Sequence, residues 1–332
     1  MGGDTRASRR RLVLAATALA CAPRALLAQP ARQALRVGML SESTEAARQA
    51  AEKRFRERLA QLGYVEGRSL AIESRYANDV VARLPALAAE LTAWKPDVIV
   101  AVSTPGAIAA KNATSTIPVV FIGPADPVGS GIVTNFARPG GNVTGFSPMQ
   151  AEIGAKWIEI LRQIVPQARR AAYLTDTGNS GEMLVFEQLR ARATALGATV
   201  EVFDGVQPGN LDHSFEALSR GRFDGLVVAL TPALLAHRDR IIRFAEQSRL
   251  PAIYARREYP DAGGLISYGA DAWALYVRAA DYVHRIAQGA KPGDLPVERP
   301  TLVKMVVNQR AARMLGIKLP QAVLVVADEV ID

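Results

Sequence analysis

Cysteine and histidine are scarce in this chain of 332 residues. Cysteine occurs once, at Cys21, and the three histidines, His213, His237 and His284, lie far apart in the sequence. A lone cysteine excludes an internal disulfide, and isolated histidines offer no convergent set of metal ligands. The motifs of a P-loop, a G-x-G-x-x-G turn, a nucleophile elbow and an H-E-x-x-H zinc site are also absent. We therefore expect no catalytic residue, no metal and no cofactor, and a protein that binds its ligand without transforming it.

Long apolar runs are missing too. The apolar stretch Leu12–Ala20 follows the basic residues Ser8–Arg11 and is too short to cross a bilayer. This pattern predicts a secretory signal peptide over residues 1–28, cleaved after Ala28, and hence a periplasmic protein. The paired Arg9 and Arg10 fit either the twin-arginine route or the general secretory route.

Cys21 closes the apolar stretch, at the place where a lipoprotein signal would have its lipid-modified cysteine. Ala18 stands three residues before it, where such signals usually have leucine. We favour an incidental apolar residue over a lipid anchor at this position.

Beyond the predicted signal peptide, no long block of like charge occurs in the chain. The formal net charge is +8, and residues 1–28 hold five arginines and one aspartate, so the remainder carries +4. Elsewhere basic residues are scattered among acidic ones, as in Glu52–Arg58, which is typical of a solvated helix face. We therefore expect no nucleic-acid partner. We also expect a monomer.

The first half of the chain reappears, in order, in the second half. Three blocks align in register: Arg36–Ser43 with Arg170–Thr177, Pro96–Pro105 with Phe223–Pro232, and Ser115–Phe121 with Ser248–Tyr254. Each block is a short apolar run that ends in small polar residues, and helical pattern follows most of them. This order predicts an α/β protein with two similar Rossmann-like lobes, each with a parallel sheet buried on both faces.

The lobes are expected to exchange chain segments at short crossings, which favours a hinge. We place residues 34–147 and about 268–307 in the N-terminal lobe, and residues 148–267 and about 308–332 in the C-terminal lobe. Residues 123–145 are rich in glycine and proline and are expected to form a long irregular loop.

Ligands of open α/β sheets bind beyond the carboxyl ends of the strands, where helices begin. The repeat places hydroxyl groups there, and the candidates are Ser41, Ser103, Thr104, Thr175 and Thr231. Helix capping is the alternative role for each of them.

Aromatic and acidic residues complete the candidate site. Phe121 and Tyr254 end matching strands and would either clamp a flat ligand or pack in the core. Glu42, Asp126 and Asp271 are the candidates to pair with a ligand ammonium, although Asp126 also fits an ordinary turn.

Particular blocks of the sequence resemble a known family. Residues Ile117–Val133 and Arg138–Gly145 resemble the ABC-transporter substrate-binding proteins, a family that includes tryptophan- and tyrosine-binding members. Leu250–Tyr259, Gly289–Val297 and Asn308–Pro320 are similar to later blocks of this family. The resemblance spans nearly the whole mature chain and implies a type I periplasmic-binding fold. It also implies that the protein closes on a small solute and delivers it to a permease with a cytoplasmic ATPase.

The resemblance carries over to the site position by position. The positions that match the ligand-binding places of the family are Ser41, Ser103, Thr104, Asp126, Thr231 and Tyr254. The first loop reads Ser-Glu-Ser-Thr-Glu, unlike the loop with Thr-Gln of the aromatic amino-acid binders, so the sequence leaves the solute open: an amino acid or another small carboxylate. A sensory receptor that presents its ligand to a membrane signalling protein is the alternative function.

Overall fold

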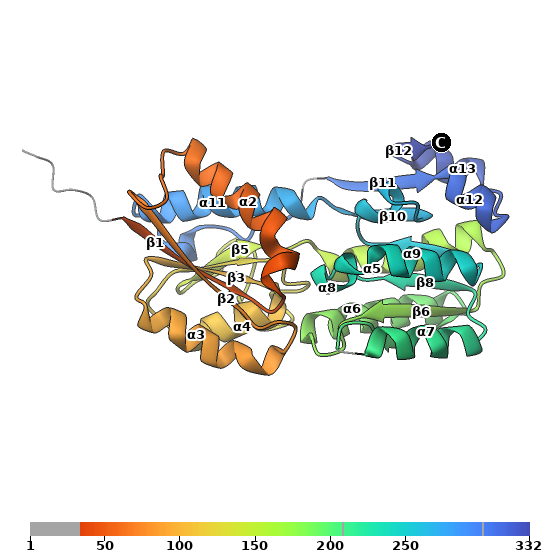
Figure 1. The fold of residues 1–332 in the computed structure, drawn as a ribbon, viewed down its shortest axis with the longest axis horizontal. Helices are drawn as coiled ribbons and strands as arrows, with labels where there is room; N and C mark the ends of the chain where they lie inside the picture. Colours follow the sequence, from red (N-terminus) through yellow and green to blue (C-terminus); the bar gives the residue numbers. More distant parts are fainter. Residues whose placement is uncertain (1–33, 208, 301) are drawn as a thin grey trace, which may run out of the picture. The chain divides into compact units, whose positions relative to one another are not determined.

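The computed structural model describes residues 34–207, 209–300 and 302–332 (Figure 1). The signal peptide, its paired arginines and Cys21 lie outside the described residues. These expectations stay predictions.

The first lobe contains a wholly parallel sheet of five strands in the order β2-β1-β3-β4-β5. The strands are β1 (Leu35–Ser41), β2 (Leu70–Tyr76), β3 (Val98–Val102), β4 (Val119–Ile122) and β5 (Val143–Phe146). The helical segments between them are α2 (Glu45–Gln61), η1 (Val81–Arg83), α3 (Leu84–Ala93) and α4 (Ser103–Ala113). Every residue of β3 and β4 is buried, as expected for apolar strands between two helix layers.

The second lobe contains a sheet of seven strands in the order β12-β11-β10-β9-β8-β6-β7, parallel except for the β10–β11 pair. The strands are β6 (Arg170–Thr175), β7 (Thr199–Asp204), β8 (Gly225–Val228), β9 (Ala252–Tyr254), β10 (Ile266–Ala270), β11 (Val303–Asn308) and β12 (Glu329–Ile331). The helices around them are α5 (Gln150–Ile164), α6 (Ser180–Ala195), α7 (Asn210–Arg220), α8 (Pro232–Ala236), α9 (Arg238–Gln247), α10 (Glu258–Asp261), α12 (Gln309–Leu315) and α13 (Gln321–Val326).

The internal repeat is visible in the order of the strands. The aligned blocks form β1 and β6, β3 and β8, and β4 and β9. The order β2-β1-β3-β4-β5 in one sheet corresponds to β7-β6-β8-β9-β10 in the other. The prediction of two similar lobes with parallel sheets is confirmed.

Three crossings connect the lobes. The first joins β5 to α5, and the second joins β10 to α11 (Ala272–Ala287). The third follows η2 (Pro292–Asp294) and Glu298, whose N–H donates to Gly145 of β5 (3.0 Å). The sequence placed this last crossing near residue 307, but β11 pairs with β10 in the second sheet. The chain therefore returns to the second lobe between Glu298 and Val303.

The loop predicted over residues 123–145 ends earlier than expected, because β5 begins at Val143. Gly145 lies in this strand with a φ of +154°, and a Cβ there would lie 2.1 Å from the carbonyl oxygen of Phe121. A glycine is needed for β5 to approach β4. The glycine that looked like part of a loop is the residue that lets the strand pair.

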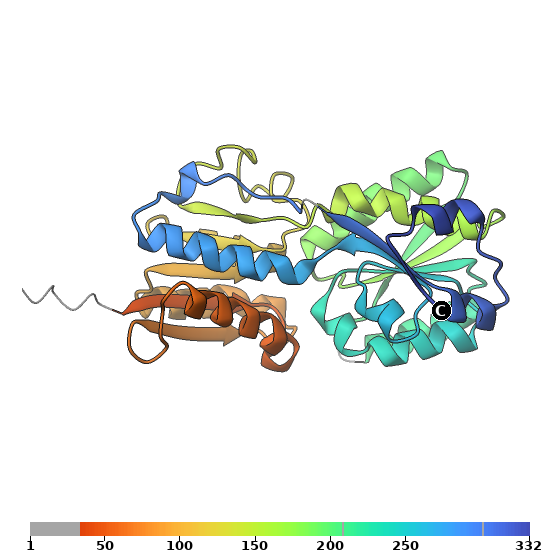
Figure 2. The same cartoon turned by 90° about the horizontal axis from the view of Figure 1, so that it is seen from above.

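Helix α11 belongs to the first lobe although it follows a strand of the second. Its residues Tyr276, Ala279 and Val283 pack with Phe55 and Leu59 of α2 over one face of the first sheet. Figure 2 shows α11 lying along this sheet. The opposite face is covered by α3 and α4, and a single apolar core fills the second lobe.

Candidate ligand-binding site

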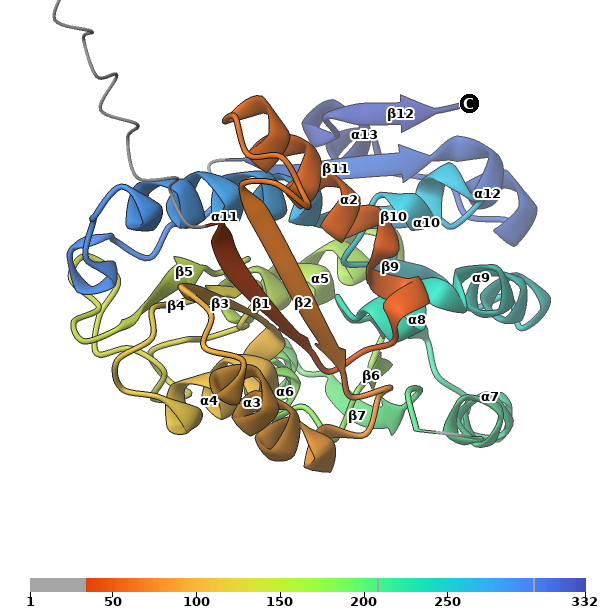
Figure 3. The same cartoon turned by 60° about the vertical axis from the view of Figure 1, so that its left-hand side comes forward.

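A cavity of about 70 Å³ lies between the lobes, at the carboxyl ends of both sheets. The first lobe lines it with Glu42, Arg48, Asp79, Ser103, Trp273 and Tyr276, and the second with Asp176, Asn179, Glu182, Thr231 and Arg256. One water needs about 10–15 Å³ of such space. The cavity therefore has room for a small solute. Figure 3 shows α2 of the first lobe beside α8 of the second, where the two lobes meet.

On the first lobe, a buried ion pair forms the wall. Arg48 lies one turn into α2 and donates to Glu42 (2.6 Å), to Ser41 Oγ (2.9 Å) and to the hydroxyl of Tyr276 (2.8 Å). Thr44 caps α2 by accepting from the N–H of Ala47, so Arg48 faces the end of β1. Burial lowers the pKa of Arg48, but Glu42 and Tyr276 raise it by more, so the guanidinium stays charged.

The start of α4 presents an unpartnered hydroxyl. Ser103 is 8% exposed and has a φ of +69°, and its Oγ has no hydrogen-bond partner among the described residues. Within the part of the chain that the structure describes, no side chain caps this helix of 11 residues, so its first N–H groups are free of that competition. A buried hydroxyl without a partner is costly. Together with the positive end of the helix dipole, it suits a carboxylate.

On the second lobe, Glu182 is the centre of a buried polar network. It accepts hydrogen bonds from Tyr173 (2.7 Å), Thr175 (3.0 Å) and Gln150 (3.0 Å). Burial raises the pKa of Glu182 to about 7, against the lowering effect of these donors. The carboxyl group of Glu182 therefore titrates near neutral pH.

Asp176 and Asp79 line the cavity from opposite lobes. The pKa of Asp176 is raised to about 6, chiefly by burial and in smaller part by the carboxylates of Asp204, Glu42 and Asp79, against the lowering effect of a hydrogen bond from the N–H of Gly178. Burial also raises the pKa of Asp79, and Glu42 adds to this rise. Carboxylates from both lobes thus repel one another at this point.

The basic side chains that line the cavity have ion-pair partners, whereas most of the acidic ones have none among the described residues. The two guanidinium groups are already paired, Arg48 with Glu42 and Arg256 with Glu258. Asp176 and Asp79 have no ion pair among the described residues. A ligand ammonium between them would relieve their repulsion. No group of three or more histidine, cysteine, aspartate or glutamate side chains in the described residues is placed to hold a metal ion.

Comparison with known proteins agrees with this architecture. The family model described as "ABC transporter substrate binding protein" matches residues 37–331. The chain belongs to this family.

The individual proteins that resemble this chain share about a quarter of its residues. The binding protein is 25% identical over 268 residues to a tyrosine-binding protein of Clostridioides difficile, covering 81% of this chain and 77% of that one. It resembles the crystal structure of a conserved domain protein from Vibrio cholerae (TM-score 0.81, 28% identity, 90% of this chain and all of that one). It also resembles an ABC domain from Streptococcus pneumoniae in complex with L-Trp (TM-score 0.79, 24% identity, again 90% and all). The fold is that of the type I periplasmic binding proteins. No helix of the binding protein within the described residues is long and apolar enough to cross a membrane.

Three of the ten residues nominated from the sequence line the cavity: Glu42, Ser103 and Thr231. Thr231 also caps α8, because its hydroxyl accepts from the N–H of Leu234 (3.2 Å). Capping and cavity lining are thus combined in one residue, as the sequence allowed.

Three further hydroxyl residues lie just behind the cavity wall. Ser41 accepts from Arg48, and Thr175 donates to Glu182. Thr104 accepts from the N–H of Ala125 (3.3 Å). Ser41 and Thr175 thus contact and orient residues that line the cavity, Arg48 and Glu182.

The other four nominated residues do not line the cavity. Phe121 is fully buried in the first lobe, and Tyr254 stacks on Tyr259 in the second, with ring centroids 4.4 Å apart. Asp126 accepts from two N–H groups of its own turn, and Asp271 caps α11. Core packing for Phe121 and Tyr254 and an ordinary turn for Asp126, the alternatives that the sequence offered, describe their contacts.

The sequence left Arg48, Asp79, Glu182, Arg256 and Trp273 unnamed. Arg48 and Glu182 lie inside helices, where charged residues are usually solvated. Their burial results from tertiary packing, for which the repeat gives no signal. Asp176 had a signal: it follows β6 where Glu42 follows β1 in the repeat.

Proposed function

We propose that the protein is the exported solute-binding component of an ABC importer. It encloses a small solute with an ammonium and a carboxylate group, an α-amino acid being the simplest, and delivers it to a membrane permease. The position of the cavity supports this most strongly: both lobes line it at the carboxyl ends of their strands, where α/β proteins bind ligands.

Two groups in the lining of the cavity differ in charge preference. Ser103 and the start of α4 suit a carboxylate. Asp176 and Asp79 suit an ammonium. A zwitterion would satisfy both groups and bridge the lobes. Relatives whose names state tyrosine or L-Trp as ligand make amino acids the first class to test.

Binding is tested by native mass spectrometry of the purified protein, followed by calorimetric titration with each standard L-amino acid. We expect at least one to bind with a dissociation constant in the micromolar range or below, about −8 kcal/mol. A carried ligand without an amino group would contradict the proposed chemistry of the site.

Delivery to a permease is tested in the producing cells. Uptake of the isotope-labelled solute should fall when the gene is deleted and return when it is restored. The matched control is restoration with the Asp176→Asn variant, which keeps the fold but loses the proposed ammonium contact. Unchanged uptake after deletion would favour a sensory receptor.

A further inference from the structure

A second, larger cavity lies behind the crossings. It measures about 370 Å³ and is lined by residues of all three crossings, among them Phe146, Ala270 and Pro300. This volume is several times that of the cavity between the lobes. A wall of side chains separates the two cavities.

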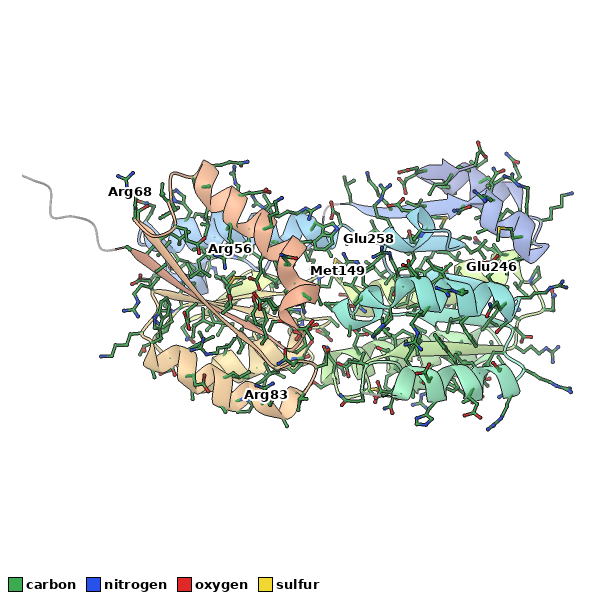
Figure 4. The ribbon with its side chains drawn as sticks, viewed as in Figure 1. Arg56, Arg68, Arg83, Met149, Glu246 and Glu258 are labelled. Carbon is green, nitrogen blue, oxygen red and sulfur yellow. The ribbon has the colours of Figure 1, made fainter. Side chains whose placement is uncertain are left out.

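The two cavities share one wall. Four residues line both of them: Arg256, Ala272, Trp273 and Leu275. Ala272 is small, Leu275 is buried in the first lobe, and Arg256 pairs with Glu258 of the second lobe. Figure 4 labels Glu258 close to the junction of the lobes. Trp273 is the largest side chain of this wall.

Two guanidinium groups lie over the ring of Trp273. The guanidinium of Arg54, from α2, lies 4.7 Å from the ring centroid, and that of Arg256, from the second lobe, lies 4.6 Å from it. Both distances are within the range of cation–π attraction. The backbone of Trp273 is fixed as well, because its N–H donates to Asp271, the cap of α11 (2.9 Å). The indole therefore has a defined position between the two cavities.

We propose that Trp273 is the partition that limits the size of the solute, an inference that rests on the proposed binding function. With the indole in place, the solute is confined to the smaller cavity. Without it, the smaller cavity opens into the larger one, and side chains that were excluded find space. Arg256 contributes the face of the partition from the second lobe, so the partition is complete only when both lobes are in place.

The test is calorimetric titration of Trp273→Ala, Trp273→Phe and the wild type with L-alanine, L-valine, L-leucine, L-phenylalanine and L-tryptophan. We expect Trp273→Ala to shift the preference for the largest over the smallest ligand by about tenfold or more. Trp273→Phe keeps an aromatic partition and should stay close to the wild type. The control is Trp94→Ala, because Trp94 stacks on Arg36 at 4.2 Å and lines neither cavity.

Crystal structures of the Trp273→Ala and Trp273→Phe variants give a reading that needs no ligand. A single joined cavity in Trp273→Ala and two separate cavities in Trp273→Phe are expected. Two separate cavities in Trp273→Ala, or a joined cavity with an unchanged size preference, would overturn the proposal. If none of the proteins binds any amino acid, the proposed ligand class fails, and the crystal structures alone decide whether Trp273 is the partition.

Discussion

Ser103 shows how a single residue can combine strain, burial and an unused hydrogen-bonding group. Its positive φ is unfavourable for a residue with a side chain, and its hydroxyl has no partner. Such costs concentrate at functional positions, where a ligand or a mechanism compensates for them. Thr231 has the same residue chemistry in the opposite lobe, but its hydroxyl is engaged by Leu234.

The two hydroxyl residues should therefore respond differently to truncation. Ser103→Ala should lower the affinity for the solute about tenfold to a hundredfold, since a lost buried hydrogen bond costs about 1–3 kcal/mol. The melting temperature of the ligand-free variant should equal or exceed that of the wild type, because the buried hydroxyl has no partner to lose. Thr231→Ala removes a helix cap and should lower stability by about 0.5–2 kcal/mol. Paired calorimetric titrations and thermal melts distinguish the two. Wild-type affinity in Ser103→Ala would remove this residue from the site.

Asp176 makes stability depend on pH. Its pKa in the folded protein, about 6, lies above its ordinary value, so the folded state binds a proton more tightly than the unfolded chain. The stability contributed by the protonated carboxyl is therefore present at acid pH and lost as pH rises through about 6. Asp176→Asn should stabilise the ligand-free protein at pH 8, by on the order of 1–3 kcal/mol, and have little effect at pH 4. Urea unfolding at the two pH values measures this, and an equal effect at both would contradict it.

At the scale of elements, Gly145 decides whether β5 can join the first sheet. Gly145→Ala should destabilise the protein by about 2 kcal/mol or more, because its Cβ would meet the backbone of Phe121. Gly140→Ala is the matched control: it also has a positive φ, of +72°, but nothing lies within 4 Å of its Cβ. Strain alone should cost it about 1 kcal/mol. Chemical unfolding of both variants compares them, and equal losses would mean that β5 tolerates a side chain.

The elements also show which parts of the fold can be predicted from the sequence. Strands buried on both faces, such as β3 and β4, follow from continuous apolar runs, and the repeat gives the order of the shared strands. β5 and β11 could not be assigned in the same way. A strand that depends on Gly145 resembles a loop, and the antiparallel partner of β10 has no counterpart in the first lobe.

The residues of the site also divide into those that the sequence predicts and those that it does not. Residues at strand ends, such as Glu42 and Ser103, could be nominated because topology brings strand ends together. Arg48 and Trp273 reach the cavity only because α2 and α11 pack against each other. That contact joins segments more than two hundred residues apart, which no local pattern predicts.

At the scale of the whole molecule, binding and closure depend on how closely the lobes approach. Gln207 of the second lobe donates to the carbonyl of Asp79 in the first (3.2 Å). Thr104 of the first lobe lies against Gly181 at the start of α6. A Cβ added to Gly181 would lie 2.0 Å from Oγ1 of Thr104. The absence of a side chain at Gly181 is thus a condition for the arrangement seen here.

Gly181→Ala should hold the lobes apart. The added methyl group cannot be accommodated by Thr104, whose β-branched side chain has few rotamers, so the lobes must separate while each keeps its own core. We expect weaker solute binding and, by small-angle scattering, a larger radius of gyration at saturating solute than in the wild type.

A second variant distinguishes this effect from damage to α6. Thr104→Gly in the Gly181→Ala background removes both the Oγ1 and the Cβ of Thr104, which would lie 2.0 and 2.8 Å from the added Cβ, and should therefore restore both affinity and compaction. A double variant that stays as weak and as extended as Gly181→Ala would show that the contact between Thr104 and Gly181 does not limit closure. Recovery of both affinity and compaction would show that the contact between Thr104 and Gly181 limits how closely the two lobes approach.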